Sequence, residues 1–155
     1  MSDTLQTIQR MLNKKSLDIV GSFNPDRSDN VCSKLRTILL VGSKEPFFWD
    51  VFKKSSEYRD NKENPLDRWS KKTIDEIAIK LNARSFFPFE APFQPFIDWA
   101  KKCSTMGSSP VRLLVHTEKG LFISFRGALG IHKYIGAANN SKDICTPCEK
   151  PCLTA

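Results

Sequence analysis

Apolar residues recur at intervals of three and four along two stretches, which is the spacing of one helix face. The first stretch covers residues 3–14, and its shared face consists of Leu5, Ile8, Met11 and Leu12. The second runs from Pro65 to about Leu81, and a proline suits the first turn of a helix. Shorter helices are expected over residues 45–52 and in the second half of residues 92–102.

Strand patterns occupy much of the remaining chain. Residues 17–23 and 83–89 are short strand candidates, and residues 35–41 form a continuous apolar run. Such a run predicts a strand that is buried on both faces. Alternating apolar positions in 110–120 and 121–129 predict a β-hairpin. The polar stretches 26–33 and 55–64 are expected to be loops.

This mixture of helices and strands predicts an α/β or α+β sandwich. We expect residues 1–140 to form this domain. Residues 141–155 would then begin a separate segment that contains most of the cysteines.

Three of the five cysteines lie in the last eleven residues, as Cys145, Cys148 and Cys152 in C-x2-C-x3-C spacing. Thiolate is a soft ligand that suits zinc, copper(I) and iron–sulfur clusters. The bacterial ferredoxin pattern is C-x2-C-x2-C-x3-C-P, so the second gap here is one residue longer. We therefore predict a ferredoxin-type iron–sulfur segment, of which this chain holds the beginning and whose fourth ligand lies beyond residue 155.

Two other interpretations of the cysteines stay open. A zinc site would need a fourth cysteine or histidine, and a redox dithiol would use only Cys145 and Cys148. A covalent haem is disfavoured because Glu149 follows Cys148 where a histidine is needed. Cys103 or Cys32 could supply a fourth ligand, although for each we expect a small buried apolar side chain.

The net charge of +7 is compatible with an anionic partner such as a tRNA, a nucleotide or an acidic redox protein. Dispersed lysine doublets favour the simpler interpretation that the charge keeps the protein soluble. The sequence has no run of about 18 apolar residues and begins without the features of a signal peptide. We therefore expect no membrane span and a cytoplasmic location.

Two polar residues of the predicted hairpin are candidate binding residues. We expect His116 to lie beside the turn with a solvated ring, with the mouth of a pocket as the alternative. An arginine within an apolar strand must meet a carboxylate, a phosphate or solvent. For Arg126 we expect an ion pair, and its candidate partners are Glu90, Asp98 and Glu118. The aromatic stretches 47–52 and 86–99 could line a flavin or corrinoid pocket, but we expect most of these residues in the core.

The run from Leu114 to Leu129 resembles the hairpin H-P-x-x-G-x-W-x-x-x-R of cobalamin-processing proteins. Its residues are Leu-Val-His-Thr-Glu-Lys-Gly-Leu-Phe-Ile-Ser-Phe-Arg-Gly-Ala-Leu. Those proteins have a nitroreductase-like fold. Epoxyqueuosine reductase, which uses cobalamin and iron–sulfur clusters on a tRNA base, has a four-cysteine ferredoxin segment after such a domain. The resemblance implies corrinoid contacts at His116, Gly120 and Arg126, while Thr117 and Phe122 depart from the proline and tryptophan of the pattern.

The whole chain is also similar to a group of bacterial ferredoxin-like proteins. The shared landmarks are Phe47-Phe48-Trp49, Ser56 to Asp60, Pro65 to Ser70, Phe87-Pro88-Phe89, Gln94-Pro95-Phe96, Ser109-Pro110 and Pro151 to Ala155. This resemblance implies that Cys145, Cys148 and Cys152 bind a 4Fe–4S cluster that exchanges electrons with a redox partner protein. A corrinoid- or flavin-dependent reductase and a zinc-bound structural module are the alternatives.

Overall fold

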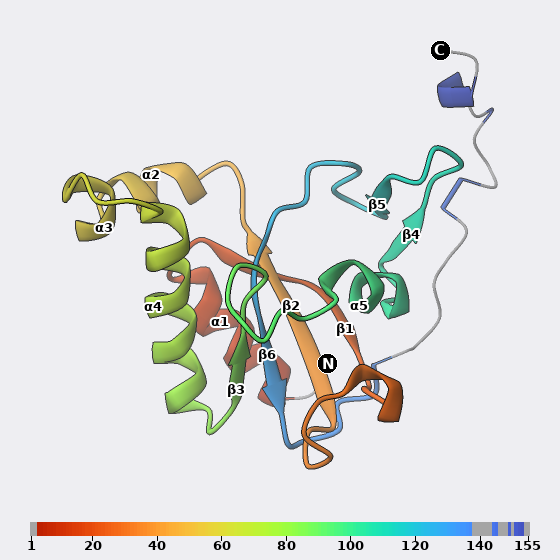
Figure 1. The fold of residues 1–155 in the computed structure, drawn as a ribbon, viewed down its shortest axis with the longest axis horizontal. Helices are drawn as coiled ribbons and strands as arrows, with labels where there is room; N and C mark the ends of the chain where they lie inside the picture. Colours follow the sequence, from red (N-terminus) through yellow and green to blue (C-terminus); the bar gives the residue numbers. More distant parts are fainter. Residues whose placement is uncertain (1–2, 138–143, 146–148, 150, 154–155) are drawn as a thin grey trace.

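The computed structural model describes residues 3–137, 144–145, 149 and 151–153. Its centre is a four-stranded sheet in the order β1-β2-β6-β3 (Figure 1). The strands are β1 (Leu17–Phe23), β2 (Thr37–Ser43), β3 (Arg84–Phe86) and β6 (Phe125–Ile131), and each neighbouring pair is antiparallel. The fold is therefore a mixed α+β fold on an antiparallel sheet, as the coarse prediction stated.

Helices cover the first face of the sheet. They are α1 (Asp3–Asn13), the short α2 (Phe48–Lys53) and α4 (Pro65–Lys80). Their apolar side chains share one buried cluster with Leu39 and Val41 of β2. In Figure 1, α4 runs beside the sheet on the left and α1 lies near it.

The second face is covered by α5 (Phe96–Lys102) and by β4 (Met106–Ser108). Ile38 and Leu40, the other alternate residues of β2, pack here around the fully buried Trp99. Strand β4 pairs with β5 (Leu114–His116) to form a small second sheet. Residues 37–42 of β2 are all buried, which confirms the prediction of a strand covered on both faces.

Two β-bulges interrupt the sheet. One lies in β1 and the other in β6, the two neighbours of β2, and both lie next to Val41 of β2. In β1 the pairing skips Val20, because Ile19 lies opposite Val41 while Gly21 lies opposite Leu40. In β6 the pairing skips Arg126, because Gly127 lies opposite Val41 while Phe125 lies opposite Gly42. Bulges bend a strand and redirect a side chain, and they are common beside functional sites.

The predicted helices agree with the structure at residues 3–14, 65–81 and in the second half of 92–102. The polar stretch 55–64 was predicted as a loop, but it contains a one-turn helix, α3 (Ser56–Arg59). Its N-cap is Ser55, whose hydroxyl accepts a hydrogen bond from the Tyr58 amide. Serine is a favoured N-cap residue, so Ser55 can start this helical turn although residues 55–64 show no apolar periodicity. The stretch 26–33 likewise contains a turn of 3-10 helix, Arg27–Asp29.

The predicted β-hairpin over 110–129 is wrong. Strand β5 pairs with β4, and the isolated bridge between His116 and Gly120 lies within the first half of the expected hairpin, so it does not join residues 110–120 to residues 121–129. The reason is that β6 pairs with β2 on one edge and with β3 on the other. A strand with both edges occupied has no edge left for residues 111–115.

Within the part of the chain that the structure describes, no helix is both long and apolar enough to cross a membrane.

Candidate functional site

The three cysteines of the C-terminal motif lie after the last strand of the sheet. Cys145 is half-buried, and Cys152 is exposed in a short turn of 3-10 helix, Pro151–Leu153. Cys148 lies outside the described residues. Among those that are described, no group of three or more histidine, cysteine, aspartate or glutamate side chains is arranged to hold a metal. The assignment of all three cysteines as cluster ligands therefore stays a prediction.

The other two cysteines occupy contrasting environments. Cys103 is fully buried between α5 and β1, as expected, and burial raises the pKa of its thiol to about 12. Cys32 is exposed, so the expectation of a buried apolar side chain is wrong there. It lines an open cavity of about 560 Å³ that Arg27, Arg36 and Tyr134 also line. Because its side chain is fully buried in the core and its Sγ donates to the Trp99 carbonyl oxygen at 3.4 Å, Cys103 is badly placed to be a fourth ligand in this fold.

His116 does not have the solvated ring that the sequence suggested, because it is only 5% exposed. Its Nε2 lies 3.0 Å from the carbonyl oxygen of Val20, the residue that the β1 bulge leaves unpaired. The hydroxyl of Thr105 donates to the same oxygen at 3.0 Å. The histidine and the threonine thus satisfy a buried carbonyl that has no partner in the sheet ladder.

The second ring nitrogen of His116 is also engaged. Its Nδ1 lies 3.0 Å from the amide nitrogen of Glu118 and 3.2 Å from that of Lys119, and both amides donate to it. Nδ1 must therefore be the unprotonated nitrogen, so Nε2 carries the hydrogen and donates it to Val20. In this conformation neither nitrogen is available to a metal ion. The role that the structure gives His116 is to join the β5 turn to the bulge of β1.

Gly120 lies in the turn that His116 closes. Backbone hydrogen bonds join the two residues in both directions, at 2.8 and 3.0 Å. The φ of Gly120 is +58°, in the left-handed region that favours glycine, and a Cβ there would meet no other atom within 4 Å. The structure therefore brings His116 and Gly120 together and explains Gly120 by the turn itself.

Arg126 is the extra residue of the β6 bulge, and none of the three ion pairs expected for it forms. Its Nη2 donates to the hydroxyl of Ser124 at 2.6 Å. Glu90 instead pairs with Lys71 at 2.7 Å, and Asp98 pairs with Lys101 at 3.4 Å. Within the described residues Arg126 has no carboxylate within 4 Å, and its buried Nε has no hydrogen-bond partner.

Most of the aromatic residues belong to the core, as predicted. The buried ones in the two aromatic stretches are Phe48, Phe52, Phe86, Phe87, Phe96 and Trp99. Phe47, Trp49 and Phe93 are the exposed exceptions. Trp49 and Tyr58 contact each other edge to face with their ring centroids 6.1 Å apart.

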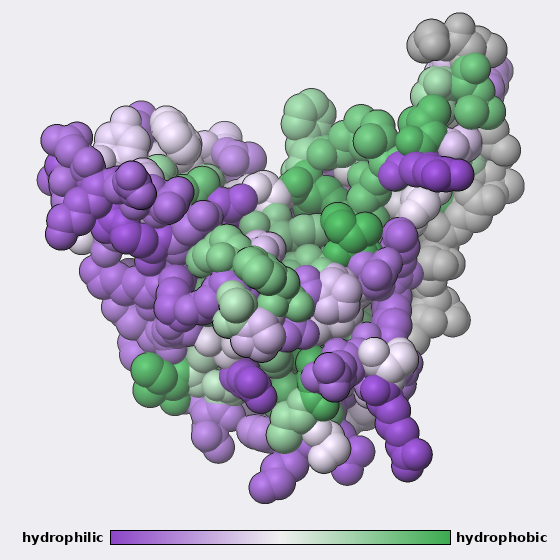
Figure 2. Space-filling model, in the orientation of Figure 1, coloured by the Kyte–Doolittle hydropathy of each residue, from purple (hydrophilic) through white to green (hydrophobic). Residues whose placement is uncertain are grey.

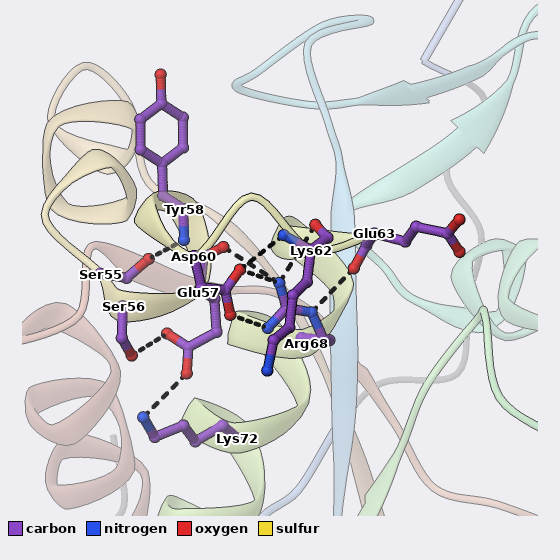
Figure 3. Close-up of polar contacts among 9 residues, drawn as sticks. All are labelled: Ser55, Ser56, Glu57, Tyr58, Asp60, Lys62, Glu63, Arg68 and Lys72. Carbon is purple, nitrogen blue, oxygen red and sulfur yellow. Dashed lines mark hydrogen bonds and ion pairs between the residues drawn. The ribbon is translucent and has the colours of Figure 1, made fainter.

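No pattern in the sequence predicts the polar cluster around Glu57, which Figure 3 shows between α3 and α4. The carboxylate of Glu57 is almost fully buried, accepts from Lys72 Nζ at 2.9 Å and lies 3.0 Å from the hydroxyl of Ser56. The hydrogen bond from Lys72 holds the pKa of Glu57 below its ordinary value, and the same bond raises the pKa of Lys72. Both groups are therefore charged near neutral pH, which makes them an ion pair and not an acid–base couple.

Arg68 of α4 stabilises the loop between α3 and α4 through hydrogen bonds (Figure 3). Its guanidinium donates to both carboxylate oxygens of Asp60, at 2.7 and 2.8 Å, and to the carbonyl oxygens of Glu57 and Glu63. The hydrogen bond from Arg68 lowers the pKa of Asp60 to about 2. One arginine thus fixes a loop in which Asn61 and Asn64 have left-handed backbone conformations.

The glutamate and its lysine border a cavity of about 240 Å³ beneath α2, to which Lys15, Lys54 and Trp69 also contribute. The charge of its lining is mixed, since Glu76 lies there as well. Nothing in the pattern of residues 55–64 could have revealed this site, because Lys72 reaches Glu57 only through the packing of α4 against α3.

No protein-family model, no curated protein and no solved structure matches this chain.

Replacing His116 by phenylalanine should lower the free energy of unfolding by about 1–3 kcal/mol, because three polar groups lose a partner in a buried site. These are the Val20 carbonyl and the amides of Glu118 and Lys119. Urea denaturation followed by circular dichroism measures the change. His132→Phe is the control, since among the described residues this exposed ring contacts just the Lys34 carbonyl oxygen; it should change stability by less than about 0.5 kcal/mol. Equal effects of the two variants would contradict the capping role of His116.

The Glu57–Lys72 pair should make stability depend on acid pH. Because the pKa of Glu57 is lowered in the folded state, its contribution is complete above the ordinary value of 4.5 and is lost as pH falls through the folded value. Melting temperatures of Glu57→Gln should therefore lie below those of the wild type at pH 7 and approach them at pH 3. Glu63→Gln is the control, since its carboxylate makes no hydrogen bond or ion pair in the described part of the chain. A constant difference in melting temperature across this range would contradict the assignment.

Proposed function

We propose that this protein is an iron–sulfur protein of the ferredoxin type, in which Cys145, Cys148 and Cys152 bind a 4Fe–4S cluster beside the α+β domain. The observation that carries the proposal is the C-x2-C-x3-C spacing of three cysteines after the last strand. The donor chemistry fits, because thiolates are the usual ligands of such clusters. The exposed position of Cys152 supports the proposal as well, since its thiol is not used in the packing of the domain.

A bound cluster would supply one-electron transfer, with a potential set by exposure and by hydrogen bonds to the sulfurs. The chain contributes three soft donors, and a fourth ligand is required that the proposal does not assign. The net charge of +7 favours an acidic redox partner protein, whose association would weaken as salt increases. A reducing compartment such as the cytoplasm would keep the cysteines as thiols until the cluster forms.

A second candidate is a corrinoid- or flavin-dependent reductase on a domain of the nitroreductase-like or cobalamin-processing type. The observation that favours it is the apolar surface between His116 and Arg126, where Leu121 is 56% and Phe122 90% exposed. Figure 2 shows apolar side chains gathered over the β4–β5 region on the right and polar ones over α3 and α4 on the left, with a hollow between them. With both ring nitrogens engaged, His116 would contribute to such a pocket by holding its wall and not by ligating cobalt.

The full-length protein, purified without oxygen and reconstituted with iron and sulfide, should contain about four iron atoms per chain and show a broad absorbance near 400 nm. Iron content measured by mass spectrometry and the EPR spectrum of the reduced protein test this expectation. Serine replacements at residues 145, 148 and 152 should each lower the iron content by more than about half, because each removes one thiolate ligand.

Cys32→Ser is the matched control, since it removes an exposed thiol outside the motif and should leave the iron content unchanged. Colourless protein with one tightly bound zinc would contradict the cluster proposal and support a zinc module. Full iron content in Cys145→Ser and Cys152→Ser would show that other residues are the ligands.

For the second candidate, hydroxocobalamin and flavin mononucleotide are titrated separately into the same protein. Binding should shift the visible spectrum of the added cofactor, and Phe122→Ser should weaken it because the variant removes an exposed aromatic contact. Val111→Ser, which alters another exposed apolar residue near β5, is the control. No spectral change with either cofactor would contradict this candidate without affecting the cluster proposal.

A further inference from the structure

The position of Arg126 in the β6 bulge determines where its side chain can act. In a regular strand, residues an odd number of positions apart point to opposite faces. Phe125 and Ala128 are three positions apart, yet both pack in the cluster on the second face. The bulge has therefore reset the alternation at Arg126, which lies opposite no residue of β2.

The guanidinium of Arg126 is only partly satisfied, because the side chain is half-buried and its buried Nε has no hydrogen-bond partner among the described residues. Burial lowers its pKa, and the negative charge of Asp67 on α4 opposes the shift only partly. Asp67 is not within ion-pair distance, and the only hydrogen bond that the described residues provide goes to the hydroxyl of Ser124. Taking a charge out of water without a partner is costly, so a protein that keeps one usually supplies the partner in another way.

The hydroxyl of Ser124 adds a second donor at the same place. Its oxygen accepts from Arg126 Nη2 at 2.6 Å, and the described part of the chain offers no acceptor for its own hydrogen. An oxygen held in this way can still donate its hydrogen. Arg126 and Ser124 together thus present several N–H and O–H donors close to each other, and no carboxylate of the described residues accepts from them.

The surroundings also bear on the kind of ligand. The loop that leads into β6 exposes Leu121 and Phe122, so an apolar surface precedes Ser124 by only two or three residues. The chain enters β6 between the polar side chains over α3 and α4 and the apolar ones over the β4–β5 region (Figures 1 and 2). A ligand that carries both an acidic group and an apolar body matches this pairing of features.

We propose that Arg126 and Ser124 form a binding site for an anionic group, a carboxylate or a phosphate, on a ligand with an apolar portion. The guanidinium pairs with the anion through its planar N–H donors, and the Ser124 hydroxyl donates to a further oxygen. Leu121 and Phe122 contact the apolar portion. The site does not depend on the cluster, because none of its residues belongs to the cysteine motif.

Phenyl phosphate and phenylacetate are suitable probes, because each joins an anion to an aromatic ring and together they separate the two anion types. The probe is titrated into the full-length protein while NMR follows the Nε–H signals of its arginines. At least one probe should give a saturable shift of one such signal, which Arg126→Gln removes while weakening binding at least about tenfold. Arg36→Gln, at an exposed arginine that makes no ion pair with a described residue, should leave the affinity unchanged.

Two further variants distinguish binding from a structural role. Asp67→Asn should strengthen binding by a factor of about 2–5, because it removes a competing negative charge. Without a probe, Arg126→Gln should melt at the same temperature as the wild type or higher, since it removes a half-buried charge that has no ion-pair partner among the described residues. Retained affinity in Arg126→Gln, no saturable shift with either probe, or a clearly lower melting temperature of this variant would each overturn the proposal. Iron content measured in parallel reports separately on the cluster proposal.

Discussion

The architecture depends on the burial of residues 37–42 of β2, whose two faces both require an apolar cover. Alternate residues of this strand point in opposite directions, so Leu39 and Val41 need the helices α1 and α4 while Ile38 and Leu40 need α5 and β4. One layer, with α1 and α4, therefore has to pack on one face of β2, and a second layer, with α5 and β4, on the other face. The chain achieves this with antiparallel pairing on both edges of β2 and with a bulge on each side of Val41.

Each bulge leaves a polar group outside the regular strand pairing, the Val20 carbonyl in β1 and the Arg126 side chain in β6, and the two groups differ in their hydrogen-bond partners. The carbonyl of Val20 receives hydrogen bonds from Thr105 and His116, which attach the small β4–β5 sheet to the edge strand β1. The close approach is visible in Gly21, where a Cβ would lie 2.8 Å from the sulfur of Cys103. Arg126, at the other bulge, has a hydrogen bond only to a serine two residues away. The polar group at the β1 bulge is thus fully hydrogen-bonded, while at the β6 bulge the Nε of Arg126 has no acceptor among the described residues.

The long helices and the buried strand could be predicted because their signals are local and periodic. The positions of Leu5, Ile8 and Leu12 already define the inner face of α1. The pairing of strands could not be predicted in the same way, since the alternation in residues 111–125 fits a hairpin equally well. What decides against the hairpin is the insertion of β6 between β2 and β3, which are distant in sequence.

The candidate site shows the same division. Residue type alone was enough to single out His116 and Arg126 as polar side chains in an apolar setting. The buried position of His116 depends on the carbonyl of Val20, which lies 96 residues earlier in the chain. Arg126 has no ion-pair partner among the described residues, because Glu90 pairs with Lys71 and Asp98 pairs with Lys101. Glu57 escaped notice because α3 has no apolar repeat and because its partner lies on another helix.

The β6 bulge also has a consequence for how the Arg126 position could change in evolution. Because Arg126 is the one extra residue of the bulge, deletion of its codon would leave Phe125 opposite Gly42 and Gly127 opposite Val41, so it would restore regular pairing and remove only this side chain. Substitutions would alter the chemistry of the position but not its direction. Gain or loss of this site among related chains would therefore be expected through changes in length at the start of β6, a kind of change that a comparison of residue identities alone would overlook.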